Sequence, residues 1–179
     1  SINGLTPGES SNALAVARDT QASGSVSGFA DVSLISSGAG TTGAPDAALP
    51  GAQVALTGRV YAPAVVQVAN TVVDFGIVRV GDAVAARGIT VANTANGALN
   101  DTLRTTASAS GAPFTTSGEL AALVAGESDG SAITVQLDTG SAGGFSGGTT
   151  LTFTRRNPDL ADLGLGSADV TLLAQVNRL

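Results

Sequence analysis

The stretch that decides the fold is Val170-Thr171-Leu172-Leu173-Ala174-Gln175-Val176, near the end of the 179-residue chain. Its apolar residues fall on every second position, which places them on one face of an extended strand. The same alternation occurs at Val54-Ala55-Leu56-Thr57-Gly58-Arg59-Val60. The Val and Thr residues that dominate such stretches favour pleated, half-buried backbone. The two stretches therefore predict two equivalent strands.

Short runs with the same alternation follow the rest of the chain, separated by Gly, Ser, Asn and Asp. They predict further strands at residues 14–16, 32–34, 65–80, 89–91, 103–107, 133–137 and 151–153. Only residues 118–123 carry a helix signal, long enough for about one or two turns. The sequence predicts an all-β protein, with strands at spacings typical of a β-sandwich.

An internal repeat sets the domain organisation. Leu5-Thr6-Pro7-Gly8-Glu9-Ser10 matches Leu123-Val124-Ala125-Gly126-Glu127-Ser128, with a period of about 118 residues. The following strands correspond face for face, because residues 14, 16, 32, 34, 54, 56, 58 and 60 fall on residues 133, 135, 151, 153, 170, 172, 174 and 176. Residues 62–179 are thus predicted to hold a complete module. Residues 1–61 match only its C-terminal half, and residues 62–114 have no upstream counterpart.

The half module is expected to need a partner, because a small sheet with one apolar face must cover that face. Three sources remain open: the preceding part of a longer chain, another copy of this chain, or a face of the complete module. The chain begins at Ser1 rather than Met, so we expect a processed protein or an excerpt, with no signal peptide remaining.

The opening Val73-Asp74-Phe75-Gly76-Ile77-Val78-Arg79-Val80-Gly81 resembles that of a major-sperm-protein-like module of the immunoglobulin-like type. Ile89-Thr90-Val91-Ala92-Asn93-Thr94-Ala95 resembles its second strand, ending in an Asn turn, and residues 123–128 resemble a later loop. The tandem form, with Gly58-Arg59-Val60-Tyr61 closing a module, is similar to bacterial choice-of-anchor D domain proteins. The resemblance implies tandem immunoglobulin-like β-sandwich modules in exported proteins, with a structural or adhesive role and no catalytic residues.

The two copies differ at one place. Ser36-Ser37-Gly38-Ala39-Gly40 of the half module becomes Arg155-Arg156-Asn157-Pro158-Asp159 in the complete one, and the closing Gly-Arg-Val-Tyr becomes Ala174-Gln175-Val176-Asn177. We interpret the second module as a divergent, terminal copy, since terminal repeats face solvent rather than a neighbour.

Composition excludes several classes of function. The chain has no His, Cys, Met or Lys, and all eight basic residues are Arg. This removes Ser-His-Asp and Cys-His catalysis, the usual zinc, haem and iron–sulfur ligands, and Schiff-base chemistry. A net charge of −6 with 3% aromatic residues argues against nucleic acid as a partner. No apolar run is long enough to span a membrane. We therefore expect no enzyme activity, no cofactor and no metal site.

Three sets of residues could either form a functional site or serve only the structure. Gly144-Phe145-Ser146-Gly147-Gly148 fits the G-x-S-x-G pattern of a hydrolase elbow by letter, but the chain has no His base, and we interpret the glycines as hairpin-loop residues.

The acidic residues Asp46, Asp159, Asp162 and Asp169 could bind calcium or act as the carboxylates of a glycosidase. Their spacing does not suit either, and solvated turns are the preferred interpretation. Glu9 and Glu127 are interpreted as equivalent loop-anchoring residues.

Arg155-Arg156 is the only basic doublet. It could bind an anionic partner, but we favour a strand edge at which charge discourages stray pairing, with Asp159 or Asp162 as an ion-pair partner. Phe75, on a strand with Val73 and Ile77, is predicted to be a centre of packing, and Gly76 suits a bulge.

Two functions follow from these features. The first is a structural module of a bacterial extracellular or cell-surface fibre, assembling by strand pairing and module stacking with other copies of itself or neighbouring modules. The alternative is an adhesin or carbohydrate-binding module on a surface stalk, binding a glycan or host surface through loops Asn96–Asn100 and Asn157–Gly166.

Overall fold

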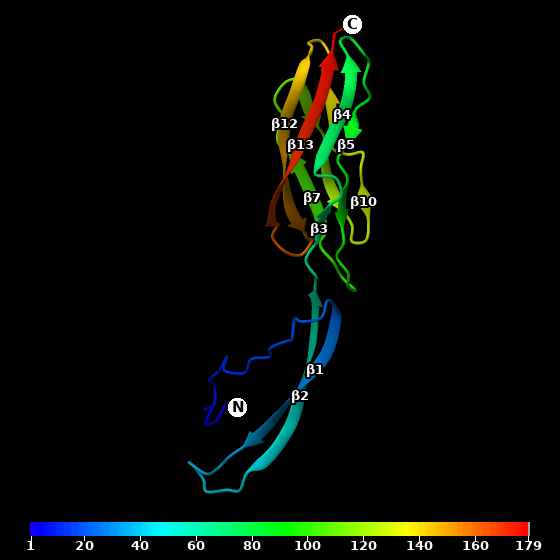
Figure 1. Ribbon diagram of the computed structural model, residues 1–179. Helices are drawn as coiled ribbons and strands as arrows, with labels where there is room; N and C mark the ends of the chain where they lie inside the picture. Colours follow the sequence, from blue (N-terminus) through cyan, green and yellow to red (C-terminus); the bar gives the residue numbers. More distant parts are fainter. Residues whose placement is uncertain (179) are drawn as a thin grey trace. The chain divides into compact units, whose positions relative to one another are not determined.

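The computed structural model describes residues 1–178, which contain strands, turns and irregular segments but no helix. The chain divides into two compact units (Figure 1): unit 1 is residues 1–60, and unit 2 begins at Tyr61. Among residues 1–178 there is accordingly no helix with the length and apolar character that a membrane crossing requires.

Unit 1 consists of one antiparallel hairpin and, before it, an irregular segment, residues 1–23, which is called the leader below. The hairpin pairs β1 (Gly24–Ser36) with β2 (Ala47–Val60), with a bulge between Val32 and Leu34. The strand predicted at residues 14–16 does not form, and residues 1–23 contain no other strand. The two strands that do form are those whose pairing partner lies within the same unit.

Unit 2 contains the remaining strands, and nearly all of them pair antiparallel. They are β3 (Val66–Val68), β4 (Val72–Arg79), β5 (Arg87–Gly88), β6 (Val91–Asn93), β7 (Thr102–Ala107), β8 (Phe114–Ser117), β9 (Glu119–Leu123), β10 (Ser128–Asp129), β11 (Thr134–Leu137), β12 (Gly143–Arg156) and β13 (Leu163–Asn177). Strand β4 is the exception, since it runs parallel to β13.

These strands form a β-sandwich. A five-stranded sheet has the order β4-β13-β12-β7-β9, and two three-stranded sheets have the orders β10-β6-β3 and β5-β11-β8. Buried apolar side chains from all three sheets form one core, including Phe75, Val91, Phe114, Val135 and Leu172. The all-β sandwich that the alternating sequence predicted is the fold of this unit.

A bulge in β4 changes which residues of that strand face the core. Leu173 pairs with Asp74 and Gln175 pairs with Ile77, so β4 has one extra residue here, and Gly76 adopts a φ of 72°. Phe75 is buried and its ring lies 6.1 Å from that of Phe114, as expected for a packing centre. Ile77 belongs to the same strand, as predicted, but it is 76% exposed because the extra residue turns it into solvent.

The predicted helical turn at residues 118–123 is also wrong. These residues form strand β9, which pairs with β7 and buries Leu120 and Leu123. Gly118, with a φ of 90°, lets the chain turn between β8 and β9.

Candidate functional site

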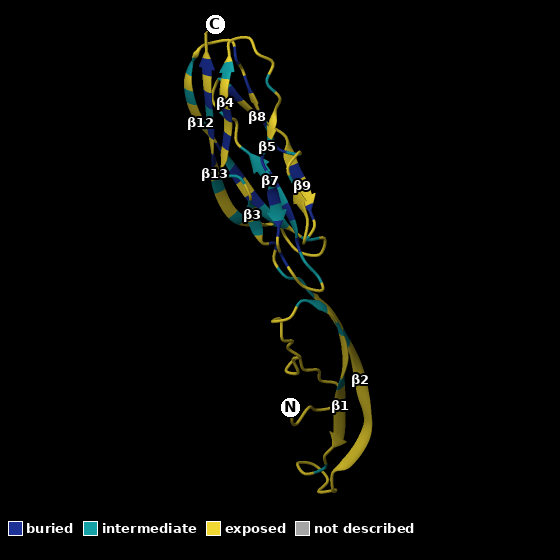
Figure 2. Cartoon of the chain, turned by 45° about the vertical axis from the view of Figure 1, so that its right-hand side comes forward, coloured by how far each residue is buried: buried dark blue, intermediate teal, exposed yellow. Residues whose placement is uncertain are grey.

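The hairpin of unit 1 has an apolar face that the other residues of this unit leave uncovered. Leu34 and Val54 are 44% and 49% exposed, and Val32, Leu56 and Val60 are only half-buried. Their counterparts in unit 2, Leu151, Phe153, Val170, Leu172 and Val176, are all at most 3% exposed. Figure 2 shows the contrast: β1 and β2 have no buried position, whereas buried and less buried positions alternate in the second half of β12 and of β13.

The two hairpins have the same pairing register at the repeated positions. Gly24 pairs with Val60 as Gly143 pairs with Val176, and Gly28 pairs with Leu56 as Gly147 pairs with Leu172. A polar cross-strand pair also corresponds. Gln53 donates a 2.9 Å hydrogen bond to Asp31 in unit 1, and Thr150 donates a 2.7 Å bond to Asp169 at the equivalent positions of unit 2. The same side of each hairpin is therefore built to meet a core.

The turns that precede the hairpins correspond as well. The amide of Glu9 donates to the Thr6 carbonyl at 3.0 Å, as that of Glu127 donates to Val124 at 3.3 Å, and Gly8 and Gly126 have φ values of 88° and 84°. Asp19 and Asp138 each accept a 2.9 Å hydrogen bond from the amide two residues on. Backbone geometry places Glu9 and Glu127 in equivalent turns.

Residues 13–19 of unit 1 correspond to β11 and its flanks, but only β11 is a strand. Leu14 and Val16 are 54% and 64% exposed, whereas Ile133 and Val135 are buried. In unit 2, β11 pairs with β5 and β8, which lie in the part of the module that unit 1 lacks. The predicted strand at 14–16 fails to form because the described part of unit 1 holds no partner strand for it.

A glycine on each hairpin marks where an aromatic side chain fits. A Cβ atom on Gly147 would lie 3.1 Å from the ring of Phe114, so the ring packs directly on the backbone there. The equivalent Gly28 has nothing within 4 Å of a Cβ. Residues 16–19, with parts of β1 and β2, line a hollow at this place.

The G-x-S-x-G stretch is part of strand β12 and does not form a loop. Residues 144–148 lie inside β12 and pair with residues 171–175 of β13. The interpretation of these glycines as hairpin-loop residues is therefore wrong, and the equivalent residues 24–28 likewise lie in a strand, at the start of β1. Gly147 leaves room for a ring instead of forming a turn.

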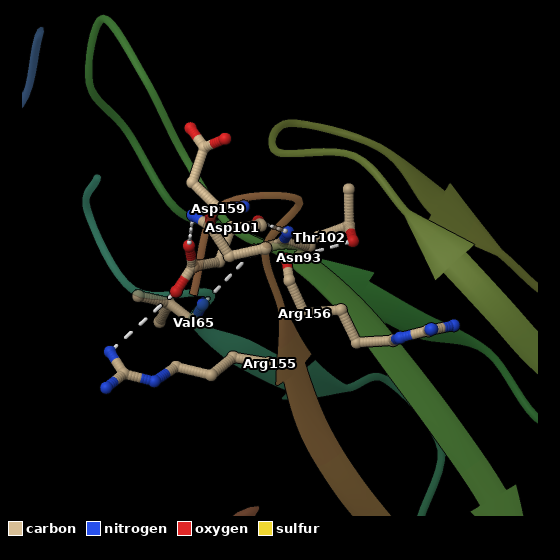
Figure 3. A network of polar contacts seen from close by, with 8 residues as sticks. Val65, Asn93, Asp101, Thr102, Arg155, Arg156 and Asp159 are labelled. Carbon is tan, nitrogen blue, oxygen red and sulfur yellow. Dashed lines mark hydrogen bonds and ion pairs between the residues drawn. The ribbon is translucent and has the colours of Figure 1, made fainter. Parts of the chain in front are cut away.

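The principal polar cluster of unit 2 surrounds Asn93 and Asp101 (Figure 3). The Asn93 side chain is fully buried; its amide nitrogen donates to the carbonyls of Asp101 and Leu123, and its oxygen accepts from the amides of Val65 and Ala95. Asn93 thus ties four segments together, and the bond from the Ala95 amide, two residues on, closes a turn at the end of β6, as the sequence suggested. The burial of Asn93 and its longer-range hydrogen bonds could not be predicted from the sequence, because the partners lie up to 30 residues away.

Buried Asp101 connects this cluster to the loop after β12. Its Oδ1 accepts a 2.7 Å hydrogen bond from Asn157, and its Oδ2 lies 3.7 Å from Arg155 Nη1. The Asn157 oxygen in turn accepts from the amide of Asp159, whose carboxylate accepts from the Tyr61 hydroxyl at 2.7 Å. These contacts bring the start of the 157–166 loop beside the residue that follows loop 96–100, and they satisfy the carboxylates internally.

The arginine doublet lies at the end of the central strand, not at a sheet edge. Arg155 pairs across to Leu103 of β7 and to Leu163 of β13. Arg156 forms an ion pair with Asp162 at 3.1 Å, as suggested, but Arg155 pairs with Asp101 rather than with Asp159 or Asp162. The edge interpretation is therefore wrong, because β7 continues the sheet beyond β12.

The acidic residues do not converge on a metal or catalytic site. Asp159, Asp162 and Asp169 each have a different partner: Tyr61, Arg156 and Thr150. Within residues 1–178 no three carboxylates come close enough to hold an ion. Asp46 lies at the end of the hairpin turn in unit 1.

One carboxylate that sequence reasoning did not single out is held by backbone donors. Asp129 Oδ1 accepts 2.7 Å hydrogen bonds from the amides of Ala132 and Ser131. The backbone hydrogen bond from Ala132, followed by that from Ser131, holds the pKa of Asp129 below its usual value of 3.8. Its role is to close the turn before β11.

Comparison with known proteins adds no relative, since neither a family model nor a curated protein matches this chain. The uncovered hairpin is the strongest candidate for a functional surface among the described residues.

Proposed function

We propose that this protein is a structural module of a bacterial extracellular or cell-surface fibre, joined to its neighbours by strand pairing at the unit 1 hairpin. The observation that carries the proposal is the apolar hairpin face, left exposed at positions whose unit 2 counterparts are buried. Unpaired strands and apolar side chains at alternate positions are what strand addition uses to bind.

The hairpin offers two strand edges as well as a face. Within residues 1–178, strands β1 and β2 pair only with each other, whereas β12 also pairs with β7 and β13 also pairs with β4. An open assembly needs two unlike surfaces, one on each side of the contact. Unit 2 supplies a second one at the outer edge of β4, where Val72 and Ile77 are 50% and 76% exposed.

Light scattering and negative-stain microscopy of the full chain, over a range of concentrations, test this function. We expect linear assemblies whose mass grows with concentration. Replacing Val54→Asp together with Leu56→Asp should return the chain to a monomer, because two charges on the pairing face oppose burial. Leu160→Asp is the matched control, since Leu160 is an exposed leucine outside both surfaces. A chain that stays monomeric throughout, or assembles equally well with the hairpin changes, contradicts the proposal.

The alternative, a glycan- or host-binding module, draws support from one observation. Loops 96–100 and 157–166 approach each other through the Asn157–Asp101 hydrogen bond. It predicts saturable binding to a glycan array that loop substitutions such as Asn96→Ala abolish without altering stability. An array without binding contradicts it.

A further inference from the structure

We infer that the half module of unit 1 is completed by a polypeptide segment of the same kind as residues 61–117, and that a second copy of this chain does not supply it. Residues 61–117 are called the first-half segment below. The inference deepens the proposed function, on which it rests, because it names the partner of the exposed hairpin.

Unit 2 shows which strand pairs with each edge of its own, equivalent hairpin. Strand β7 pairs with residues 151–156 of β12, and β4 pairs in parallel with residues 171–177 of β13. The equivalent positions in unit 1 are residues 32–37 and 55–60. Both β4 and β7 belong to the first-half segment. A segment of this kind would therefore add one strand to each side of the hairpin.

The leader of unit 1 lacks partners from the same segment. Strand β11 is held between β5 and β8, both within residues 61–117. Its counterpart at residues 15–18 is not a strand; Val16 within it and Leu14 just before it are exposed. The leader keeps apolar residues, Leu14 and Val16, at the positions of buried Ile133 and Val135, without the strands that would bury them. At the position of Leu137 it has Arg18 instead.

Gly28 identifies a side chain of the partner. Phe114, the first residue of β8, lies on Gly147 and fills the space that a Cβ would take. Unit 1 keeps the glycine at the equivalent position, with open space above it. The partner is thus expected to place a bulky, ring-sized side chain over Gly28.

A count of the parts excludes a second copy as the source. The 179 residues of the sequence carry one first-half segment and two second halves, at residues 1–60 and 119–177. The first-half segment of each copy is already packed in its own unit 2. Any number of copies of these 179 residues is therefore short of one first-half segment per copy, whatever exchange of strands takes place. Self-association can bury the hairpin face but cannot supply partners for residues 14–18.

A fusion tests the inference on the full chain. Residues 61–118 are duplicated directly ahead of Ser1, because Ser1 corresponds to Glu119 and the join preserves the spacing of unit 2. Amide hydrogen exchange is measured at residues 14–18 and 24–36, with the amides of β12 in the same sample as the reference. We expect exchange at residues 14–18 to slow about a hundredfold or more relative to the unfused chain, because opening would then disrupt a packed core.

Two variants make the result specific. In the fusion, Gly28→Leu should restore fast exchange at residues 14–18 while leaving β12 unchanged, since its side chain would occupy the place of the ring. Leu103→Asp in the added segment only, at a position fully buried in unit 2, should do the same. In the unfused chain Gly28→Leu should have no effect.

Unchanged exchange at residues 14–18 in the fusion overturns the inference, even if light scattering shows that the unfused chain assembles through its hairpin. Slow exchange at residues 14–18 in the assembled, unfused chain overturns it too, because a second copy would then have supplied the strands. Conversely, protection in the fusion supports it even if the unfused chain proves monomeric and the proposed assembly fails.

Discussion

At the scale of single residues, Gly147 shows how the repeat can be tested within one molecule. Gly147→Val would push a side chain into the ring of Phe114, since even a Cβ would lie 3.1 Å away. We expect unit 2 to lose about 1–3 kcal/mol, the usual range for overpacking. Gly28→Val should change stability by less than about 0.5 kcal/mol in the natural chain, as for an unconstrained surface site. Urea unfolding of both variants measures this, and equal losses would show that the two glycines are not distinguished by packing.

Asn93 is the buried polar residue on which the loops of unit 2 depend. Asn93→Ala removes two donated and two accepted hydrogen bonds and leaves backbone groups of Val65 and Leu123 without that partner. At about 1–3 kcal/mol for each buried group left unsatisfied, we expect a loss of roughly 3 kcal/mol. Denaturant unfolding is the measurement, with exposed Asn96→Ala as control. A loss below that of the control would mean that water replaces the amide.

The same residue shows what the sequence leaves undetermined. Phe75 and the Gly76 bulge could be predicted, because a large apolar residue in an aromatic-poor chain and a glycine in a strand are local signals. The burial of Asn93 and the outward orientation of Ile77 could not, because each depends on a contact or register shift with a distant strand. The inward-facing residues of β12 and β13 were predictable, and their polar neighbours at Asp101 were not.

At the scale of elements, equivalent strand segments are expected to respond differently to the same change. Ile133→Ala removes a buried side chain next to β11 and should cost about 2–5 kcal/mol. Leu14→Ala alters the equivalent, exposed position and should stay within about 0.5 kcal/mol. Circular dichroism during urea unfolding gives both values. A comparable loss for Leu14→Ala would mean that the leader is already packed in the natural chain.

The turn at Asp129 makes an acid-sensitive contribution to unit 2. Its pKa is lowered by the amides of Ala132 and Ser131, so the ionised form is favoured by folding. The stabilisation is fully present above the unfolded value of 3.8 and is lost as the pH falls through the lower, folded value. Asp129→Asn should therefore flatten the stability profile below about pH 4. The check is thermal unfolding from pH 2 to 6, with Asp162→Asn as control. If Asp129→Asn loses stability at acid pH as the natural chain does, Asp129 is not the source of the acid sensitivity.

The strand predicted at residues 14–16 failed because it has no partner strand, whereas the one at residues 133–137 has two. The alternation at residues 14–16 is as regular as at residues 133–135, yet only the second segment has β5 and β8 beside it. Strand β9 was mistaken for a helical turn, because Ala and Leu favour helices when read locally. Pairing with β7 decides its conformation instead. An alternating sequence indicates which residues of a strand could be buried. Whether the strand forms and buries them depends on the strands that lie beside it.

At the scale of the whole molecule, stability is expected to reside in unit 2. Every buried core residue lies between Ala64 and Val176. A fragment of residues 61–179 should therefore unfold with nearly the same midpoint and the same urea dependence as the full chain, because the urea dependence follows the surface exposed on unfolding. A clearly steeper dependence for the full chain would show that unit 1 unfolds together with unit 2 as one cooperative body.

The hydrogen bond between the Tyr61 hydroxyl and Asp159 has an optical consequence. Tyr61 is the only tyrosine of a chain without tryptophan, so the near-ultraviolet emission of the native protein comes essentially from one phenol. A carboxylate that accepts the phenolic proton's hydrogen bond quenches that emission. Detachment of the 157–166 loop from the first residue of unit 2 would thus appear as a rise in fluorescence, with no label attached.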